Sequence, residues 1–293
     1  MGRRSAEKIH FTSFDDLFGG KDPEIIEESQ VARIPLEQLH PFKNHPFRVL
    51  DDEEMIEMVE SVKKYGVLAP AIVRRDGNGE YELISGHRRK RASELAGCQD
   101  MPVIIKDLTD DEAVIVMVDS NIQRQNILPS EKAKAYRMKM EALGHQGVKG
   151  DQHTAELVGE AAGDSVRTVH RYIRLTYLSP ELLEQVDRRR VPVMAAECIS
   201  FLSKEEQEML QEVMEENHVI PNKQEAERLK AESEAGQLTV DRVKEILAKT
   251  SGVSGITISA KKIQDYFPAG STKEQIEKII FGLLDSWKLS GNV

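Results

Sequence analysis

The residues best suited to chemistry lie between 81 and 92, where a β-type run is followed by GHRRKRA. Gly86 at the strand end would let the backbone approach a ligand closely, and the helix beginning there would point free N–H groups at it. Arg88, Arg89 and Arg91 add guanidinium groups, whose planar forks match phosphate oxygens. The pattern predicts a polyphosphate site. A solvated helix face or a patch contacting the DNA backbone is the alternative, since short basic clusters are common.

A second polar cluster, DSNIQR at 119–124, follows an apolar helical segment and precedes Pro129. Helix ends near the edge of an α/β unit are places where ligands gather. Ser120 and Asn121 have side-chain oxygens for a hydrated Mg²⁺, and Arg124 has a guanidinium for a phosphate. The same residue types suit a loop that simply ends a helix, and taken alone they favour the loop.

The segment 154–175 has the pattern of a helix-turn-helix. One helix precedes Gly163, which suits the turn, and a second begins near Ser165. The outer face of the second helix carries Arg167, Thr168, His170, Arg171 and Arg174, with no acidic residue between 165 and 174. A locally basic helix on an acidic protein is typical of a recognition helix in the DNA major groove. An ordinary helical hairpin is the alternative.

A helix is expected just before these clusters. Asp51 or Asp52 can cap its start, and Gly66 is a natural stop after Tyr65. Its expected apolar face consists of Met55, Ile56, Val59 and Val62.

Strands and helices then alternate up to about residue 128. The runs 71–75 and 81–85 flank a Gly- and Asn-rich turn and predict a hairpin. A further apolar strand is expected over 101–108, and Thr109 with Glu112 predicts a capping box for the next helix. This alternation indicates a small mixed α/β domain.

From Pro129 to about residue 250 every segment has helical periodicity. Ser179–Pro180 and the pair Ser203 and Glu206 are expected helix starts. A looser stretch, SGVSG, precedes a last piece, 256–293, whose predicted helix has an apolar stripe of Ile276, Ile279, Ile280, Leu283, Leu284 and Trp287.

The composition excludes several classes of protein. The chain has 293 residues and a net charge of −10, with no apolar run close to the roughly 18 residues of a membrane span. Two unpatterned cysteines exclude a disulfide scaffold, and no secretory signal is evident, so a cytoplasmic location is expected. The acidic balance does not exclude nucleic acid, because 204–234 alone holds ten Glu against four Lys and Arg.

The motifs, in their order along the chain, resemble those of the ParB partition family. The similar segments are GVLAPAIVRR at 66–75, ELISGHRRKRASELAG at 82–97, MPVIIKDL at 101–108 and SNIQRQNILPSEKAKAY at 120–136, followed by the helix-turn-helix. The resemblance covers roughly 31–205. It implies an α+β ParB/sulfiredoxin-like nucleotide-binding domain at 31–128, an all-α helix-turn-helix DNA-binding region at 129–250, and a small C-terminal helical element at 256–293 after a flexible tail at 1–30.

The resemblance also assigns roles to individual residues. The nucleotide, CTP with Mg²⁺ in this family, would contact Gly66, Val67, Pro70, Gly86, His87, Arg88, Arg89, Ser120, Asn121, Gln123 and Arg124. Asn121 would be the Mg²⁺ ligand, and the DNA-contacting residues would be Ser165, Arg167, Thr168, His170, Arg171 and Arg174.

The chain departs from the family pattern at two carboxylates. His87 stands where the family usually has Glu, and Ser120 replaces the Glu before Asn121. Those carboxylates are associated with Mg²⁺ and hydrolysis, so the resemblance implies no more than a weak CTPase. The segment Asn44–Arg48 resembles an early Pro-Arg motif of the family, about one residue out of register.

The family resemblance implies a homodimer that loads on double-stranded DNA at a centromere-like site and closes into a sliding clamp. Arg3, Arg4, Leu17 and Phe18 in the tail would engage a ParA-type ATPase. The protein would then associate with the nucleoid or a plasmid and support segregation. A tail with no partner is the alternative for these four residues.

Two other functions remain open from the sequence. One is a helix-turn-helix transcription regulator with a degenerate nucleotide domain, which the residues at 87 and 120 favour. The other is an ATP-using enzyme like sulfiredoxin, which ranks lower because Ser85 and His87, rather than a catalytic Cys, flank Gly86.

Overall fold

The computed structural model describes residues 31–248 except 78 and 125, and also 266–267, 272, 275–276 and 278–283. The chain divides into two compact units, Met1–Leu247 and Ala248–Val293. The predicted tail at 1–30, with its expected ATPase contacts, lies outside the described residues, as does most of the predicted element at 256–293. Among the described residues, no helix is both long enough and apolar enough to cross a membrane.

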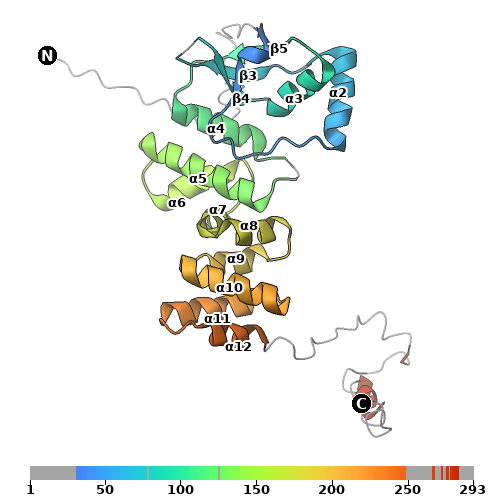
Figure 1. Cartoon of the computed structure of the whole chain (residues 1–293), viewed down its shortest axis with the longest axis vertical. Coiled ribbons are helices and arrows are strands. Elements are labelled where there is room, and N and C mark those ends of the chain that lie inside the picture. Colours follow the sequence, from blue (N-terminus) through green and yellow to red (C-terminus); the bar gives the residue numbers. More distant parts are fainter. Residues whose placement is uncertain are drawn as a thin grey trace, which may run out of the picture. The chain divides into compact units, whose positions relative to one another are not determined.

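A five-stranded mixed sheet organises the first part of the chain (Figure 1). The strands, in the order β1-β5-β3-β4-β2, are β1 (Val31–Pro35), β5 (Asp100–Ile105), β3 (Ala71–Arg75), β4 (Tyr81–Ser85) and β2 (Leu39–Pro41). The pairs β1–β5 and β3–β4 are antiparallel, whereas β3–β5 and β2–β4 are parallel. The predicted hairpin is therefore confirmed, and its turn places the start of β3 beside the end of β4.

The sheet is built on fully buried aliphatic side chains, Val73, Leu83, Met101 and Val103. The strand predicted over 101–108 ends earlier, at Ile105. The Lys106 amide still donates to the Val73 carbonyl at 2.9 Å, and the chain then leaves the sheet toward Thr109. The expected end was wrong because Leu108, the apolar residue that extended the predicted strand, lies in the connection between β5 and the helix that follows it.

Helix α2 (Glu53–Tyr65) begins at Asp52, whose carboxylate accepts the Met55 amide at 3.0 Å, and ends at Gly66. It packs beside α3 (His87–Ala96), with Met55 and Val62 buried against Ala92. The expectation that Ile56 shares this face is wrong, because its side chain is 61% exposed. Positions 55 and 56 are adjacent on a helix and so diverge by about 100°.

Helices α4 (Asp110–Asn121) and α5 (Pro129–His145) connect the sheet to the helical region. The predicted capping box of Thr109 and Glu112 is confirmed at the start of α4. One core joins these elements, since Ile84 of the sheet, Met117 of α4 and Tyr136 of α5 lie in the same buried cluster as Val158 and Val169. The sheet domain and the helix-turn-helix therefore share a hydrophobic core.

The helix-turn-helix consists of α6 (Asp151–Glu160) and α7 (Val166–Arg174). Its turn depends on Gly159, because a Cβ there would lie 2.4 Å from the carbonyl oxygen of Asp164. After the short 3-10 helix η2 (Leu175–Tyr177), the remaining helices are α8 (Pro180–Asp187), α9 (Val193–Ile199), α10 (Lys204–Asn217), α11 (Lys223–Glu234) and α12 (Val240–Ala248). The predicted starts at Ser179–Pro180 and Ser203 are confirmed by side-chain caps.

Candidate nucleotide site and DNA interface

Gly86 forms the turn between β4 and α3 in a conformation that suits glycine, with φ of 109° and ψ of 20°. A Cβ at this position would lie 2.8 Å from the Cβ of Ala71. No side chain caps α3, so its first N–H groups are not occupied by a capping side chain. An uncapped helix start at a close-packed glycine is a suitable place for an anion.

The arginines of α3 have different partners. Arg88 pairs with Asp52, with 2.9 Å between Nη2 and Oδ1, and Arg91 pairs with Asp51 at 2.6 Å. These pairs fasten α3 to the start of α2, and sequence reasoning assigned the two Asp residues only to capping. The Arg88 guanidinium has its pKa raised by the neighbouring Asp52 carboxylate.

Arg89 has no carboxylate partner among the described residues. Its guanidinium donates to the carbonyl oxygens of Ala69 and Pro70, at 2.7 and 2.6 Å. Burial lowers the pKa of Arg89, because the charged form loses water without gaining an acid. A bound phosphate would supply the missing negative charge, and the two carbonyl contacts join the GVLAP motif to the start of α3.

Two histidines lie stacked beside this helix start. The ring centroids of His45 and His87 are 3.8 Å apart and the ring planes are tilted by 37°. His45 Nδ1 lies 2.8 Å from the carbonyl oxygen of Phe47. Burial lowers the pKa of both rings, that of His87 to about 3. Sequence reasoning did not select His45, although the motif-like segment Asn44–Arg48 pointed to its neighbourhood.

The second polar cluster lies at the end of α4. Ser120 Oγ donates to the Met117 carbonyl at 3.0 Å, and Asn121 Nδ2 donates to the same oxygen at 2.9 Å. Gln123 Nε2 donates to the Ala161 carbonyl at 3.1 Å, at the end of the first helix of the helix-turn-helix. Ser120 and Asn121 therefore hydrogen-bond within α4, whereas Gln123 links this cluster to the helix-turn-helix.

These contacts bring several predicted nucleotide-binding residues together. Arg89 joins the segment Gly66–Pro70 to the start of α3, His87 stacks on His45, and the charge of Arg124 lowers the pKa of His45. Gly66 ends α2 with φ of 72°, which leads the chain into this segment. Contacts therefore join the segment 66–70 to α3 and α3 to His45, and the charge of Arg124 acts on the His45 ring.

Two of the predicted DNA-contacting arginines of α7 form bonds with the helix that packs beside it. Arg171 pairs with Glu197 at 2.6 Å, and Arg174 donates to the Ser200 carbonyl at 2.6 Å. Both side chains are therefore bonded to α9 and its end. Arg167 is exposed and makes no hydrogen bond or ion pair with the described part of the chain.

The other predicted residues of α7 lie near its start. Ser165 caps the helix by accepting the Thr168 amide at 3.2 Å, and the two hydroxyls are 2.9 Å apart. His170 Nε2 lies 3.5 Å from a carboxylate oxygen of Asp151. Arg174 has no carboxylate partner either, but its guanidinium is held by Ser200, whereas the side chain of Arg167 has no hydrogen bond or ion pair within the described residues.

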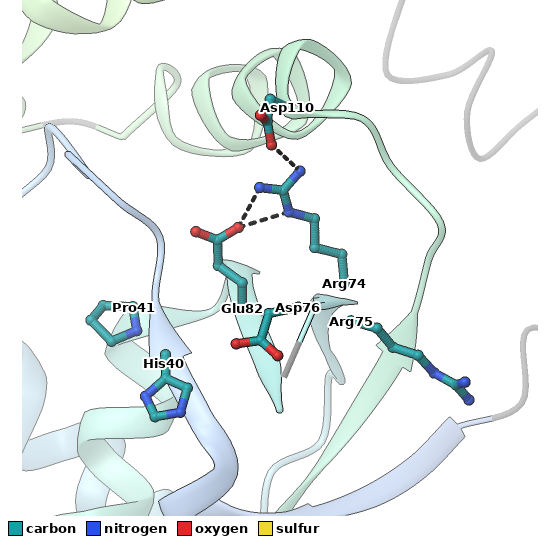
Figure 2. A pocket seen from close by; sticks show the side chains of 8 residues that line it. His40, Pro41, Arg74, Arg75, Asp76, Glu82 and Asp110 are labelled. Carbon is teal, nitrogen blue, oxygen red and sulfur yellow. Dashed lines mark hydrogen bonds and ion pairs between the residues drawn. The ribbon is translucent and has the colours of Figure 1, made fainter. Parts of the chain in front are cut away.

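A polar pocket of about 380 Å³ lies at the other end of the β3–β4 pair (Figure 2). Arg74 lies between Glu82 and Asp110, with ion pairs of 2.6 and 2.7 Å. The pocket is also lined by His40, Pro41, Arg75, Asp76 and Gly77. Because Arg74 is already neutralised by two carboxylates, this pocket is a weaker anion site than the start of α3.

The fold defines a class of protein in which an α+β domain shares its hydrophobic core with a helix-turn-helix. Residues 20–122 match the ParB N-terminal domain family. The nucleoid occlusion protein of Geobacillus thermodenitrificans is 30% identical over 221 residues, which cover 75% of this chain and 74% of that protein. That of Listeria innocua is 32% identical over 213 residues, covering 70% and 72%. The chain belongs to the ParB family.

The chromosome-partitioning protein Spo0J of Thermus thermophilus is 35% identical over 176 residues. The match covers 60% of this chain and 62% of that protein, less than two thirds of its length. A Caulobacter crescentus ParB structure complexed to the centromeric parS site has 22% identity and a TM-score of 0.43, and covers 74% of this chain and 99% of that one. The family assignment therefore rests on the sequence relatives.

Proposed function

We propose that this protein is a CTP-responsive partition protein that binds double-stranded DNA at a centromere-like site. The observation that carries the proposal is Arg89, a half-buried guanidinium without an acid partner in the described chain, at the uncapped start of α3. A polyphosphate would satisfy both the charge and the free helix N–H groups. Relatives named for chromosome partitioning and nucleoid occlusion support the same function.

DNA binding is assigned to α7. Arg167, exposed on the first turn, would reach base edges in the major groove, and His170 lies on the next turn. Arg171 and Arg174 would position the helix through their contacts with Glu197 and Ser200. Such a division separates one residue that reads DNA from two that hold the reading helix.

The nucleotide site would influence DNA binding through the segment between α4 and α5. Gln123 bonds to the end of α6, and Ser130 donates its amide and hydroxyl to Asp187 of α8, at 2.9 and 2.6 Å. A nucleotide that moved this segment would pull on both helices. We propose that the homodimer uses this connection to close as a clamp on DNA, and that a ParA-type ATPase acts on the nucleoid- or plasmid-bound protein.

The residues present do not fit a Mg²⁺ ion well. Mg²⁺ in phosphate sites prefers one or two carboxylates, but positions 87 and 120 carry imidazole and hydroxyl groups. Asp52 and Glu54 already pair with Arg88. No group of three or more His, Cys, Asp or Glu that could hold a metal occurs in the described residues. Asn121, the expected Mg²⁺ ligand, therefore has no carboxylate beside it at position 120. We propose weak CTP hydrolysis without assigning it a metal-dependent step.

Calorimetric titration of the full chain with CTP, ATP and GTP tests the proposal. We expect selective CTP binding, and we expect Arg89→Ala to weaken it by at least tenfold, since the change removes a half-buried charge facing the anion. Arg75→Ala is the matched control, because Arg75 is exposed at the opposite end of β3. Equal binding of the three nucleotides, or an unaffected Arg89→Ala variant of native fold, refutes the proposal.

A transcription regulator with a degenerate nucleotide domain is the second candidate. It is favoured by Ser120 and Asn121, whose side chains bond within α4. A chromatin map distinguishes the two functions. Occupancy that spreads over kilobases around one site supports the clamp, whereas sharp peaks at promoters support the regulator.

A further inference from the structure

The stacked pair of His45 and His87 has unsatisfied polar atoms at the candidate nucleotide site. Nε2 of each ring is buried and has no hydrogen-bond partner in the described part of the chain. A buried polar atom without a partner is destabilising, because it has lost its hydrogen bonds to water. A ligand that reached the two rings, whose centroids are 3.8 Å apart, could form hydrogen bonds with both atoms.

The protonation state of His45 follows from its neighbour. The Phe47 carbonyl can only accept, so the proton of the neutral ring lies on Nδ1. Nε2 of His45 then carries a lone pair that receives no hydrogen bond within the described residues. A proton added to Nε2 would convert this acceptor into a charged donor.

The groups that face the pair explain why it is neutral without a ligand. Burial is the largest reason that the pKa of His87 is lowered, and the charges of His45 and of Lys90 on α3 act in the same direction. His45 faces Arg124 and, from α5, Glu131, which is the carboxylate that favours protonation. Glu131 also accepts the backbone amides of Arg48 and Leu128, at 2.8 and 3.1 Å. Burial is the largest influence on both rings, and the one carboxylate that favours protonation does not offset it; Lys90 is itself paired with Glu94 at 2.5 Å.

We propose that the His45–His87 pair takes up a proton when a nucleoside triphosphate binds, and that this proton replaces the divalent cation expected in the family. The inference rests on the proposed nucleotide function. The proton comes from solvent and adds to an Nε2 lone pair, and the new N–H donates to a phosphate oxygen. No bond of the nucleotide forms or breaks. His87 occupies the motif position where the family usually has a carboxylate. The replacement of Glu by His at this position would therefore also replace the divalent cation by a proton.

The sign of the pH dependence follows from linkage. Binding raises the pKa of the pair. The affinity is therefore highest below the pKa of the free protein, falls as the pH rises toward the pKa in the complex, and is constant above it. For one proton, the dissociation constant rises by at most about tenfold per pH unit. Titration of the terminal phosphate would not produce this fall in affinity with rising pH. Its protonation, at about pH 6, removes negative charge and so weakens binding at low pH.

The test is calorimetric titration of the full chain with CTP, at about pH 6.5, 7.5 and 8.5, in buffers of different ionisation enthalpy. Each titration is run with Mg²⁺ and with EDTA. We expect uptake of up to one proton, a dissociation constant that rises several-fold per pH unit, and the same affinity in EDTA.

Two variants isolate the pair. His87→Glu restores the usual family residue and should abolish proton uptake and make binding depend on Mg²⁺. His45→Gln should abolish uptake while leaving position 87 unchanged, which covers the case in which the first variant does not fold. His145→Gln is the control, since that ring is 70% exposed on α5 and should leave uptake unchanged.

Three outcomes would refute the inference. Binding without proton uptake overturns it, as does binding that EDTA abolishes and Mg²⁺ restores. Binding that EDTA abolishes and Zn²⁺ restores would show that the two rings hold a transition metal, which also overturns it. Absence of CTP binding at every pH, even with Mg²⁺, refutes the proposed function itself.

Discussion

Lys139→Met is expected to destabilise the protein strongly, because Lys139 forms an ion pair inside the α4–α5 interface. Its Nζ lies 2.6 Å from Oδ1 of Asp119, and the two side chains are only 6% and 12% exposed. Breaking such a pair leaves an uncompensated buried charge and costs about 3–5 kcal/mol. Asp119→Leu should cost a similar amount, since it leaves the ammonium of Lys139 alone.

The double variant should recover most of this loss. Replacing both partners with apolar side chains removes the charges together, which is often neutral. We therefore expect a double-mutant cycle in urea to give a coupling free energy of at least about 2 kcal/mol between Asp119 and Lys139. A cycle in which the single losses simply add would refute the reasoning, as would single variants as stable as the parent.

The pH dependence of the Lys139→Met variant supplies a second check. Burial already raises the pKa of Asp119, and loss of the ammonium removes the main opposing influence. In the variant, the pKa of Asp119 is higher in the folded than in the unfolded state. The neutral Asp119 carboxyl therefore contributes to stability at low pH, and this contribution is lost as the pH rises through the folded-state pKa. The deficit relative to the parent should therefore be smaller at about pH 5 than at pH 8, when urea midpoints are compared.

Two further predictions concern the proposed binding surfaces. Gly86→Ala should lower the free energy of unfolding by about 1–3 kcal/mol and weaken CTP binding, because φ of 109° is strained for alanine and the new Cβ meets Ala71; unchanged urea midpoints would contradict this. Arg167→Ala should weaken binding to the DNA site, measured by fluorescence anisotropy, without changing the melting temperature. Arg171→Ala should lower the melting temperature as well, since it breaks the pair with Glu197; equal thermal behaviour of the two variants would argue against the division of roles.

Local signals in the sequence were sufficient for the helix starts. Thr109 with Glu112 and Ser203 with Glu206 both form the predicted capping boxes, because each box depends on residues three positions apart. The hairpin of β3 and β4 was equally accessible, since its turn residues lie directly between the strands. The fold class follows from such short-range patterns.

Side-chain partners far apart in the sequence were not predictable. His45 and His87 are separated by 42 positions (87 − 45), and each looks like an isolated histidine in the sequence. In the sequence, Arg171 is indistinguishable from an outward-facing basic residue. In the folded chain, α9 places Glu197 beside it as an ion-pair partner. Periodicity predicts which residues share a face of a helix, but not which residues of other helices pack against that face. It therefore identified the basic residues of α7 without showing which of them have a partner in the folded chain.

Asp164 connects the two proposed activities through α5. Its carboxylate accepts the Tyr136 hydroxyl at 2.5 Å and pairs with Lys132 at the same distance, so the turn of the helix-turn-helix is fastened to α5. The start of α5 is in turn held by Asp187 through Ser130. Because α5 follows the polar cluster at 119–124, a displacement of its first turn would have to move the reading helix or break these bonds. Nucleotide binding and DNA binding are therefore expected to depend on each other through α5.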